Sequence, residues 1–241
     1  MHLEGGGRRD RETQGEVENT MSIVLMRAMK LDQNYLTGRL PAFIENFSAM
    51  QFLSVGINAL SGPIPKELGK LQNLLLLYID SSGLSGELPS TLSNLKNLEI
   101  LRFQGNSFEG PISSSLSNLS KLTDLWSKLS FGCRRIGDIT SGSPSLDFVS
   151  NMTSLSNLVL RNCKISDTIP SSFGQFLNLQ QLDLSYNQPS GSFPSWVSQP
   201  NLKLNLVANN FVIDSSNNSI LPSGLNCLQR NIPCSLDSPI Y

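Results

Sequence analysis

The sequence has few charged residues and no long apolar run. Only 15% of its 241 residues are Asp, Glu, Lys or Arg, and the formal net charge is −1. A nucleic-acid-binding domain needs a concentrated basic surface, so this balance argues against nucleic acid as a partner. The longest apolar runs, residues 23–26 and 74–79, are far shorter than the ~20 residues that span a bilayer. Residues 1–20 are polar and of mixed charge, and they predict no secretory signal peptide.

Histidine is also nearly absent, which removes most catalytic chemistry. The single histidine is His2, so no Ser/His/Asp or Cys/His relay can be built around it. The sequence contains no phosphate-binding G-x-x-x-x-G-K-[ST] loop and neither of the kinase motifs H-R-D and D-F-G. We therefore expect no enzyme activity in this chain, no cofactor and no metal site.

What the sequence does have is an internal repeat. A glycine followed two residues later by Leu, Ile or Phe, and usually then by Pro, recurs at equal steps as Gly38, Gly62, Gly86 and Gly110. Two later copies, at position 167, where Asp replaces Gly, and at Gly191, are separated by the same step. The sequence separation between positions 110 and 167 equals two of these steps plus nine additional residues. A regular period of about 24 residues predicts a repeat architecture.

Before each glycine stands the pattern L-x-x-L-x-L-x-x-N, for example Leu98, Leu101, Phe103 and Asn106. The L-x-L alternation predicts a short strand with one face turned inward. One strand and one return loop cannot bury their leucines alone, so successive units must stack as a parallel sheet. The pattern therefore predicts a solenoid.

The asparagine that ends each strand is expected to be structural. A carboxamide both donates and accepts hydrogen bonds, so it can satisfy the backbone groups that a tight turn points inward. Ser82 takes this place in one copy. The other members of this predicted ladder are Asn34, Asn58, Asn106, Cys163, Asn187 and Asn209.

These motifs resemble the plant-specific leucine-rich repeat, whose signature is L-x-G-x-[IL]-P after the asparagine. Residues 36–41, 60–65 and 84–89 match it fully. More narrowly, LVLRNCKISDTIP, LQQLDLSYN, GSFPSWV, LNLVANNF and GLNCLQRNIPC resemble the ectodomain of plant receptor-like serine/threonine kinases that carry a malectin-like domain after the repeats. The resemblance implies an α/β-type leucine-rich-repeat solenoid: a curved horseshoe with a parallel sheet of short strands on its concave face and 3-10, short helical or irregular segments on its convex side. About eight repeats are expected, one of them interrupted.

The resemblance also predicts a division of the chain. Residues 1–25 form an atypical or disordered tail, 26–212 the solenoid and 213–236 a C-terminal cap. Residues 237–241, SPIY in the last four places, resemble the start of a malectin-like domain. The family pattern runs from Leu125 directly to Arg135, so residues 126–134 are interpreted as a nine-residue insertion. We expect them to form an exposed loop, with Leu125 and Ile136 both pointing into the core; a functional loop is the alternative.

Recognition is expected on the solvent-facing strand positions. Aromatic and arginine side chains on an exposed strip are typical of protein interfaces. An ordinary solvated face is the alternative. The candidates are Phe52, Leu76, Tyr78, Asp80, Arg102, Gln104, Arg161, Asp183 and Tyr186.

Cysteines and sequons fit an extracellular protein. Cys227 and Cys234 bracket six residues after the last repeat, where a solenoid needs a cap, and a disulfide there suits an oxidising compartment. A metal pair is the alternative, although no further Cys or His lies nearby. The candidate N-glycosylation sites are Asn46, Asn118, Asn151 and Asn217.

The function that these features favour is recognition of an extracellular peptide, a cell-wall fragment or a co-receptor ectodomain. The resemblance implies that the full-length receptor kinase acts in signalling on the extracellular side of the plasma membrane. A truncated decoy, a gene-model fragment and a non-receptor leucine-rich-repeat inhibitor scaffold remain alternatives.

Overall fold

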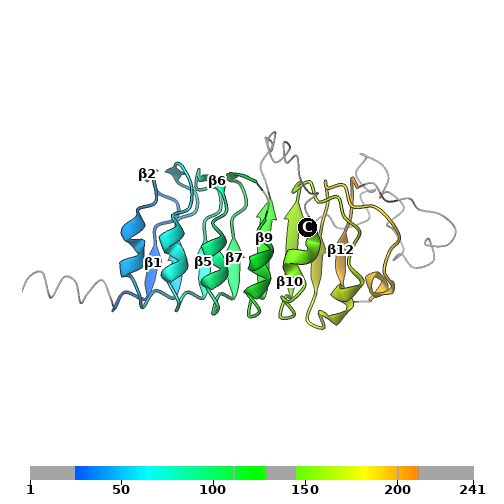
Figure 1. The fold of residues 1–241 in the computed structure, drawn as a ribbon. Coiled ribbons are helices and arrows are strands. Elements are labelled where there is room, and N and C mark those ends of the chain that lie inside the picture. The colour runs from blue at the N-terminus through cyan, green and yellow to red at the C-terminus, as the bar shows by residue number, and fades with distance from the viewer. Residues whose placement is uncertain (1–24, 111, 129–144, 200, 210, 212–241) are drawn as a thin grey trace, which may run out of the picture.

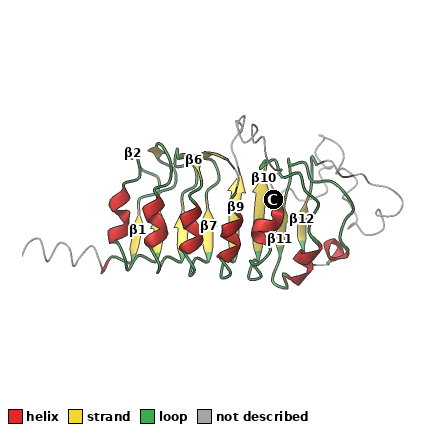
Figure 2. Cartoon of the chain, viewed as in Figure 1, coloured by secondary structure: helices red, strands yellow, loops and turns green. Residues whose placement is uncertain are grey.

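The computed structural model describes residues 25–110, 112–128, 145–199, 201–209 and 211. Within these ranges the chain forms a row of short parallel strands with short helices along one side (Figures 1 and 2). The solenoid of leucine-rich repeats predicted from the sequence is therefore confirmed, with a parallel sheet and 3-10 turns.

The main sheet has eight strands in the order β1-β3-β5-β7-β9-β10-β11-β12, and every neighbouring pair is parallel. Its strands are β1 (Ala28–Lys30), β3 (Phe52–Ser54), β5 (Leu76–Tyr78), β7 (Ile100–Arg102), β9 (Asp124–Lys128), β10 (Asn157–Arg161), β11 (Gln181–Asp183) and β12 (Lys203–Asn205). Two small parallel pairs accompany it: β2 (Thr37–Gly38) with β4 (Ala59–Leu60), and β6 (Ser85–Glu87) with β8 (Ser107–Glu109).

Short 3-10 helices carry the chain back from one strand to the next. The described residues contain η1 (Ala42–Asn46), η2 (Lys66–Lys70), η3 (Ser90–Asn94), η4 (Ser114–Asn118), η5 (Leu146–Val149), η6 (Ser171–Gln175) and η7 (Ser195–Ser198). The core lies between these helices and the sheet: Leu77 and Leu101 from the strands and Leu68 and Leu92 from the helices are all fully buried or nearly so. In the three-residue strands of the main sheet the middle residue thus points inward, and in the five-residue strands β9 and β10 the second and fourth residues do. The residues between and beside them form the other face of the sheet.

The repeat signature has a direct backbone cause. Its glycine takes a left-handed conformation, with φ of +74° at Gly62 and +77° at Gly86, which side-chain-bearing residues rarely adopt. Its proline, such as Pro65 or Pro89, directly precedes a 3-10 helix with φ of −66°, a value that the pyrrolidine ring fixes in advance.

The ladder residues lie directly after another left-handed residue, in the turn that follows the strand, as Ile57 does before Asn58 and Gly105 before Asn106. Asn106 shows the complete arrangement. Its Nδ2 donates to the carbonyls of Ile79 (2.6 Å) and Phe103 (3.0 Å), and its Oδ1 accepts from the backbone N–H groups of Ser82 (3.0 Å) and Leu84 (3.2 Å). One buried carboxamide thereby joins two repeats.

The asparagine ladder continues in the C-terminal repeats, but at the first repeat the asparagine makes no bond to a neighbouring described repeat. Asn187 donates to Leu160 O (2.6 Å) and accepts from Cys163 N (2.8 Å), while Asn209 accepts from Asn187 N (2.9 Å). Asn34 is exposed, and among the described residues its side chain bonds only to carbonyls of its own turn. Each amide therefore needs a neighbouring repeat to complete its bonds.

The expectation that residues 126–134 form an exposed loop is wrong for the first three of them. Trp126, Ser127 and Lys128 belong to β9 and pair with Val159, Leu160 and Arg161 of β10. The strand continues because β7 and β10 offer backbone partners on both sides, as in the bond from Phe103 N to Trp126 O (3.1 Å), and because the small Ser127 fits the inward place. Residues 129–134, with Cys133, and Ile136 lie outside the described residues.

The strand register shows where the surplus falls. Asp124 pairs with Ile100 of β7 on one side and with Asn157 of β10 on the other. The sequence offset to Ile100 equals one regular repeat, whereas the offset to Asn157 exceeds it by nine. The nine surplus residues therefore lie between Lys128 and Asn157, after β9 rather than within it. The predicted cap with Cys227 and Cys234, the C-terminal residues 237–241 and Asn217 also lie outside the described residues.

Candidate functional site

The exposed face of the sheet carries side chains in straight rows, because every strand pair is in parallel register. One row runs through Phe52, Leu76, Ile100, Asp124 and Asn157. The next runs through Lys30, Ser54, Tyr78, Arg102, Trp126, Val159, Asp183 and Asn205. Neighbours in a row are one strand spacing apart, about 4.8 Å.

On the first five strands these rows form a continuous aromatic–cationic strip, made of Lys30, Phe52, Tyr78, Arg102 and Trp126. Lys30 Nζ lies 5.4 Å from the Phe52 ring centroid, and Phe52 meets Tyr78 edge to face at 5.4 Å. The Arg102 guanidinium carbon lies 5.0 Å from the Tyr78 ring centroid and 5.3 Å from that of Trp126. Each cation thus lies within the range of cation–π attraction.

Arg102 lies between two aromatic rings of the strip. Its Nε is buried and has no hydrogen-bond partner among the described residues. The aromatic rings on both sides hold the planar guanidinium and so reduce the conformational entropy that Arg102 would lose on binding. A guanidinium N–H group can donate to a carboxylate or a carbonyl oxygen.

Asp80 lies next to this strip and has a perturbed carboxyl group. Burial raises the pKa of Asp80 above its ordinary value of 3.8, although the Gln104 backbone N–H and the charge of Arg102 both lower it. Gln104 N donates to Asp80 Oδ1 at 3.2 Å. The carboxyl therefore acts mainly as an acceptor for the next strand's turn.

Sequence reasoning missed two residues of the strip, and one of them is Trp126, which was assigned to the insertion. Its Nε1 donates to Asp124 Oδ1 at 3.4 Å, and Asn157 Nδ2 donates to the same oxygen at 2.8 Å. The alternation Leu125-Trp126-Ser127 was the available signal. Lys30 was also missed, although it follows the inward Met29 in the first copy of the pattern.

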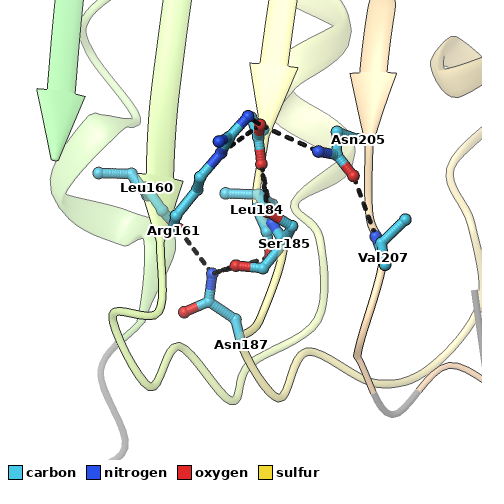
Figure 3. Close-up of polar contacts among 8 residues, drawn as sticks. Leu160, Arg161, Leu184, Ser185, Asn187, Asn205 and Val207 are labelled. Atoms are coloured by element: carbon cyan, nitrogen blue, oxygen red, sulfur yellow. Dashed lines mark hydrogen bonds and ion pairs between the residues drawn. The ribbon is translucent and has the colours of Figure 1, made fainter. Parts of the chain in front are cut away.

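On the last three strands a polar cluster replaces the strip, formed by Arg161, Asp183, Ser185 and Asn205. Arg161 Nε (2.6 Å), Arg161 Nη2 and Asn205 Nδ2 (3.1 Å) all contact Asp183 Oδ2. Ser185 donates to Asp183 Oδ1 through its hydroxyl (2.7 Å) and its backbone N–H (3.1 Å). Figure 3 shows Arg161, Ser185 and Asn205 converging on this one carboxylate.

Asp183 was expected on a solvent-exposed strip, and this expectation is wrong. Its exposed fraction is 1%, because Arg161 and Asn205 from the two neighbouring strands close over it. An ionised carboxylate that receives this many donors is already satisfied. Asp183 therefore holds Arg161 in place and does not itself face a partner.

The other predicted residues take varied places. Leu76 and Gln104 are half-buried on the exposed face. Tyr186 is exposed but lies after β11, in a left-handed turn with φ of 59°. The three sequon asparagines within the described residues, Asn46, Asn118 and Asn151, are all exposed and lie in or just after the 3-10 helices. Their use as glycosylation sites stays a prediction.

The part of the chain that the structure describes holds no group of three or more His, Cys, Asp or Glu side chains placed to bind a metal ion. A search of the same residues finds no helix of the length and apolar character needed to cross a membrane.

Comparison with known proteins assigns the family. A family model described as a leucine-rich repeat region matches residues 2–216. Two probable LRR receptor-like serine/threonine-protein kinases of Arabidopsis thaliana are each 59% identical to this chain over the matched stretch. The first match covers 64 residues, 27% of this chain and 6% of the kinase, and the second covers 44 residues, 18% of this chain and 4% of the kinase.

Solved structures show the same likeness over a longer stretch. The crystal structure of a TDR receptor aligns with a TM-score of 0.67 and 31% identity, over 77% of this chain and 31% of the receptor chain. The plant peptide hormone receptor RGFR1, solved in complex with RGF2, aligns with a TM-score of 0.61 and 31% identity over 77% and 28% of the two chains. The Arabidopsis receptor kinase HAESA, solved with the peptide hormone IDA and the co-receptor SERK1, gives 0.64 and 26% over 78% and 30%.

The chain thus spans less than a tenth of the curated kinases and about a third of the structural relatives that it matches. The predicted likeness to the repeat region of plant receptor-like kinases is confirmed. The repeat register, the asparagine ladder and the family match lead to one assignment: this chain belongs to the leucine-rich repeat family.

Proposed function

We propose that the exposed face of the sheet is the recognition surface of a plant receptor-like kinase and binds an extracellular peptide or a co-receptor ectodomain. The observation that carries the proposal is the aromatic–cationic strip, which joins five successive strands through ring and cation contacts. Aromatic and arginine side chains that are already ordered lose little entropy on binding, and for this reason they supply much of the binding energy at protein interfaces.

Two further observations support this function. The structural relatives RGFR1 and HAESA were solved in complex with peptide hormones, and HAESA also with a co-receptor. The exposed positions of Asn46, Asn118 and Asn151 leave room for glycans on the helical side, away from the strip. We accordingly place the surface outside the cell, on the extracellular side of the plasma membrane, with catalysis assigned to a kinase domain elsewhere in the receptor.

The test is a binding screen with the full chain secreted behind an added signal peptide. A synthetic library of secreted plant peptides and a panel of leucine-rich-repeat co-receptor ectodomains would be screened by biolayer interferometry. For any binder, Arg102→Ala and Tyr78→Ala should each weaken the affinity by about tenfold or more. Tyr35→Ala is the matched control, because this tyrosine is 99% exposed and lies outside the strip.

Two results would contradict the proposal. One is a binder whose affinity is unchanged in both strip variants, since it would place recognition elsewhere. The other is equal weakening by Tyr35→Ala, which would indicate a general loss of surface or fold. Circular dichroism melts of each variant separate loss of binding from loss of structure.

A further inference from the structure

A cavity lies at the edge of the sheet where β10, β11 and β12 begin. Its volume is about 680 Å³, which is within the range of small-ligand sites. Its walls come from the turns before β11 and β12 and from the first residues of these strands. Half of the residues that line it are five with carboxamide side chains: Asn178, Gln180, Gln181, Gln199 and Asn201.

Four of these five residues are exposed to solvent and Gln181 is half-buried. None of the five side chains makes a hydrogen bond to any described residue, although each can donate twice and accept twice. Asn157, a sixth carboxamide at the rim, differs because it donates to Asp124. The cavity therefore presents a set of donors and acceptors that the described part of the chain leaves open to solvent or to a ligand.

Asparagines at the positions equivalent to Asn178 and Asn201 in earlier repeats do make hydrogen bonds to the protein. Asn73 and Asn97 each stand directly before a core leucine, and they donate to the preceding repeat at Ser48 O (2.8 Å) and Gln72 O (2.9 Å). Asn178 and Asn201 also stand directly before a leucine, but they make no such bond to a described residue and line the cavity instead. Of these four asparagines, Asn73 and Asn97 thus bond to the preceding repeat, whereas the side chains of Asn178 and Asn201, at the cavity, do not bond to any described residue there.

The chemistry of the lining selects the ligand class. The described lining residues include no carboxylate and a single cation, Lys203, so the cavity favours neither a metal ion nor a strongly charged ligand. A hydroxyl both donates and accepts, and two adjacent hydroxyls match the C=O and NH₂ of one carboxamide. Leu177, 89% exposed, adds an aliphatic surface for C–H groups.

We propose that this carboxamide-lined cavity binds a neutral oligosaccharide. The site lies at the start of β10 to β12, whereas the aromatic–cationic strip runs over β1 to β9, so the two surfaces can be tested separately. Failure of one proposal leaves the other standing. A peptide is the rival ligand, because its backbone also presents N–H and C=O groups.

The experiment titrates the full chain with cellotetraose, a neutral β-linked glucose oligomer, by isothermal titration calorimetry and ligand-observed NMR. Trigalacturonic acid and tetraglycine serve as the anionic and the peptide counterparts. We expect saturable binding of cellotetraose, and about tenfold or more weaker binding in the double variant Asn178→Ala/Asn201→Ala. Asn94→Ala, an exposed asparagine at the end of η3, is the matched control and should bind as the parent does.

Four outcomes would overturn the proposal. These are no response to cellotetraose up to about 10 mM, preferential binding of trigalacturonic acid, equal binding of tetraglycine, and unchanged affinity in the double variant. If the double variant loses its cooperative melt, Gln180→Ala replaces it. The side chain of Gln180 is exposed and makes no described hydrogen bond, so its removal leaves the fold intact.

Discussion

On β1 to β9 the cations Lys30 and Arg102 lie against aromatic rings, whereas on β10 to β12 Arg161 is tied to the buried carboxylate of Asp183. Both regions have parallel strands in the same register, with mostly apolar residues pointing inward. They differ in the side chains at the outward places. A ring attracts a cation weakly and leaves its N–H groups available, while a carboxylate at contact distance uses them. The same scaffold therefore offers a surface suited to recognition at one end and a surface suited to stability at the other.

The sharpest way to break this comparison is to remove the carboxylate of Asp183. Asp183→Ala deletes the acceptor that Arg161, Ser185 and Asn205 share, and removing one partner of a buried ion pair costs about 3–5 kcal/mol. We expect a loss of about 3 kcal/mol in the free energy of unfolding, measured by urea denaturation, with the strip intact. The double variant Arg161→Met/Asp183→Leu should recover much of this loss. A loss below about 1 kcal/mol in Asp183→Ala would mean that the cluster is solvated like a surface pair.

The ladder tests what the two regions share. Asn106 and Asn187 are both buried and bond both to their own turn and to the preceding repeat. Replacing either by alanine leaves buried backbone groups without partners, at about 1–3 kcal/mol in total. We expect Asn106→Ala and Asn187→Ala to lower the free energy of unfolding by similar amounts, about 2 kcal/mol, and the exposed Asn34→Ala to change it by less than about 0.5 kcal/mol. Unequal losses at the two buried sites would show that the scaffold itself differs between the regions.

Ser127 lies at the boundary between the two regions and offers a stabilising change. It is 1% exposed and occupies an inward place where the paired residue in β10 is Leu160. Ser127→Val should raise the free energy of unfolding by about 1 kcal/mol, because it buries additional methyl groups in that row. Ser127→Ala is the control for loss of the contact between the Ser127 hydroxyl and Cys163 Sγ, 3.7 Å apart. A less stable valine variant would mean that the site has no room for the added volume.

The smallest expected change in the free energy of unfolding comes from replacing Asp80, which lies beside the strip. Since desolvation raises its pKa, the folded state binds this proton more tightly than the unfolded state does. The carboxylate therefore destabilises the fold at pH values above the folded-state pKa, and this cost disappears as the pH falls below the ordinary value of 3.8. Asp80→Asn keeps an oxygen acceptor for Gln104 N and should stabilise the protein at pH 7 by on the order of 0.5 kcal/mol. Melts at pH 7 and pH 3 check the sign: a gain that persists at pH 3 would contradict the argument.

The fold could be read from the sequence because its causes are local and repeat. The regular spacing of glycine, leucine and asparagine fixes the turn, the inward side chains and the ladder in each copy. The surplus of nine could be counted in the same way but not located, since the spacing between Gly110 and Asp167 does not say on which side of a strand the extra residues fall. The alternation of Leu125, Trp126 and Ser127 carried that information and favoured a strand.

The site was harder to predict because its contacts join neighbouring strands. Phe52, Tyr78 and Arg102 were found by their outward places alone. The burial of Asp183 depends on Arg161 and Asn205, which are distant in sequence but only one strand away in space. Tyr186 has the residue type expected at an interface, but the left-handed turn removes it from the row. The unused carboxamides of the cavity have no sequence signal, because Asn178 looks like Asn73 until their partners are seen.

The offset between paired strands has a consequence for how such a chain can change during evolution. The sequence offset from β11 to β12 is shorter than one regular repeat and that from β9 to β10 is longer, yet both pairs keep the same alignment across the sheet as β5 and β7. The differences in length lie in the segments that connect one strand to the next. An insertion or deletion in such a segment therefore leaves the alignment of side chains on the strands unchanged. Gene segments encoding loops can therefore drift in length while the row of contact residues is inherited unchanged, and a new specificity can be reached by altering one strand at a time.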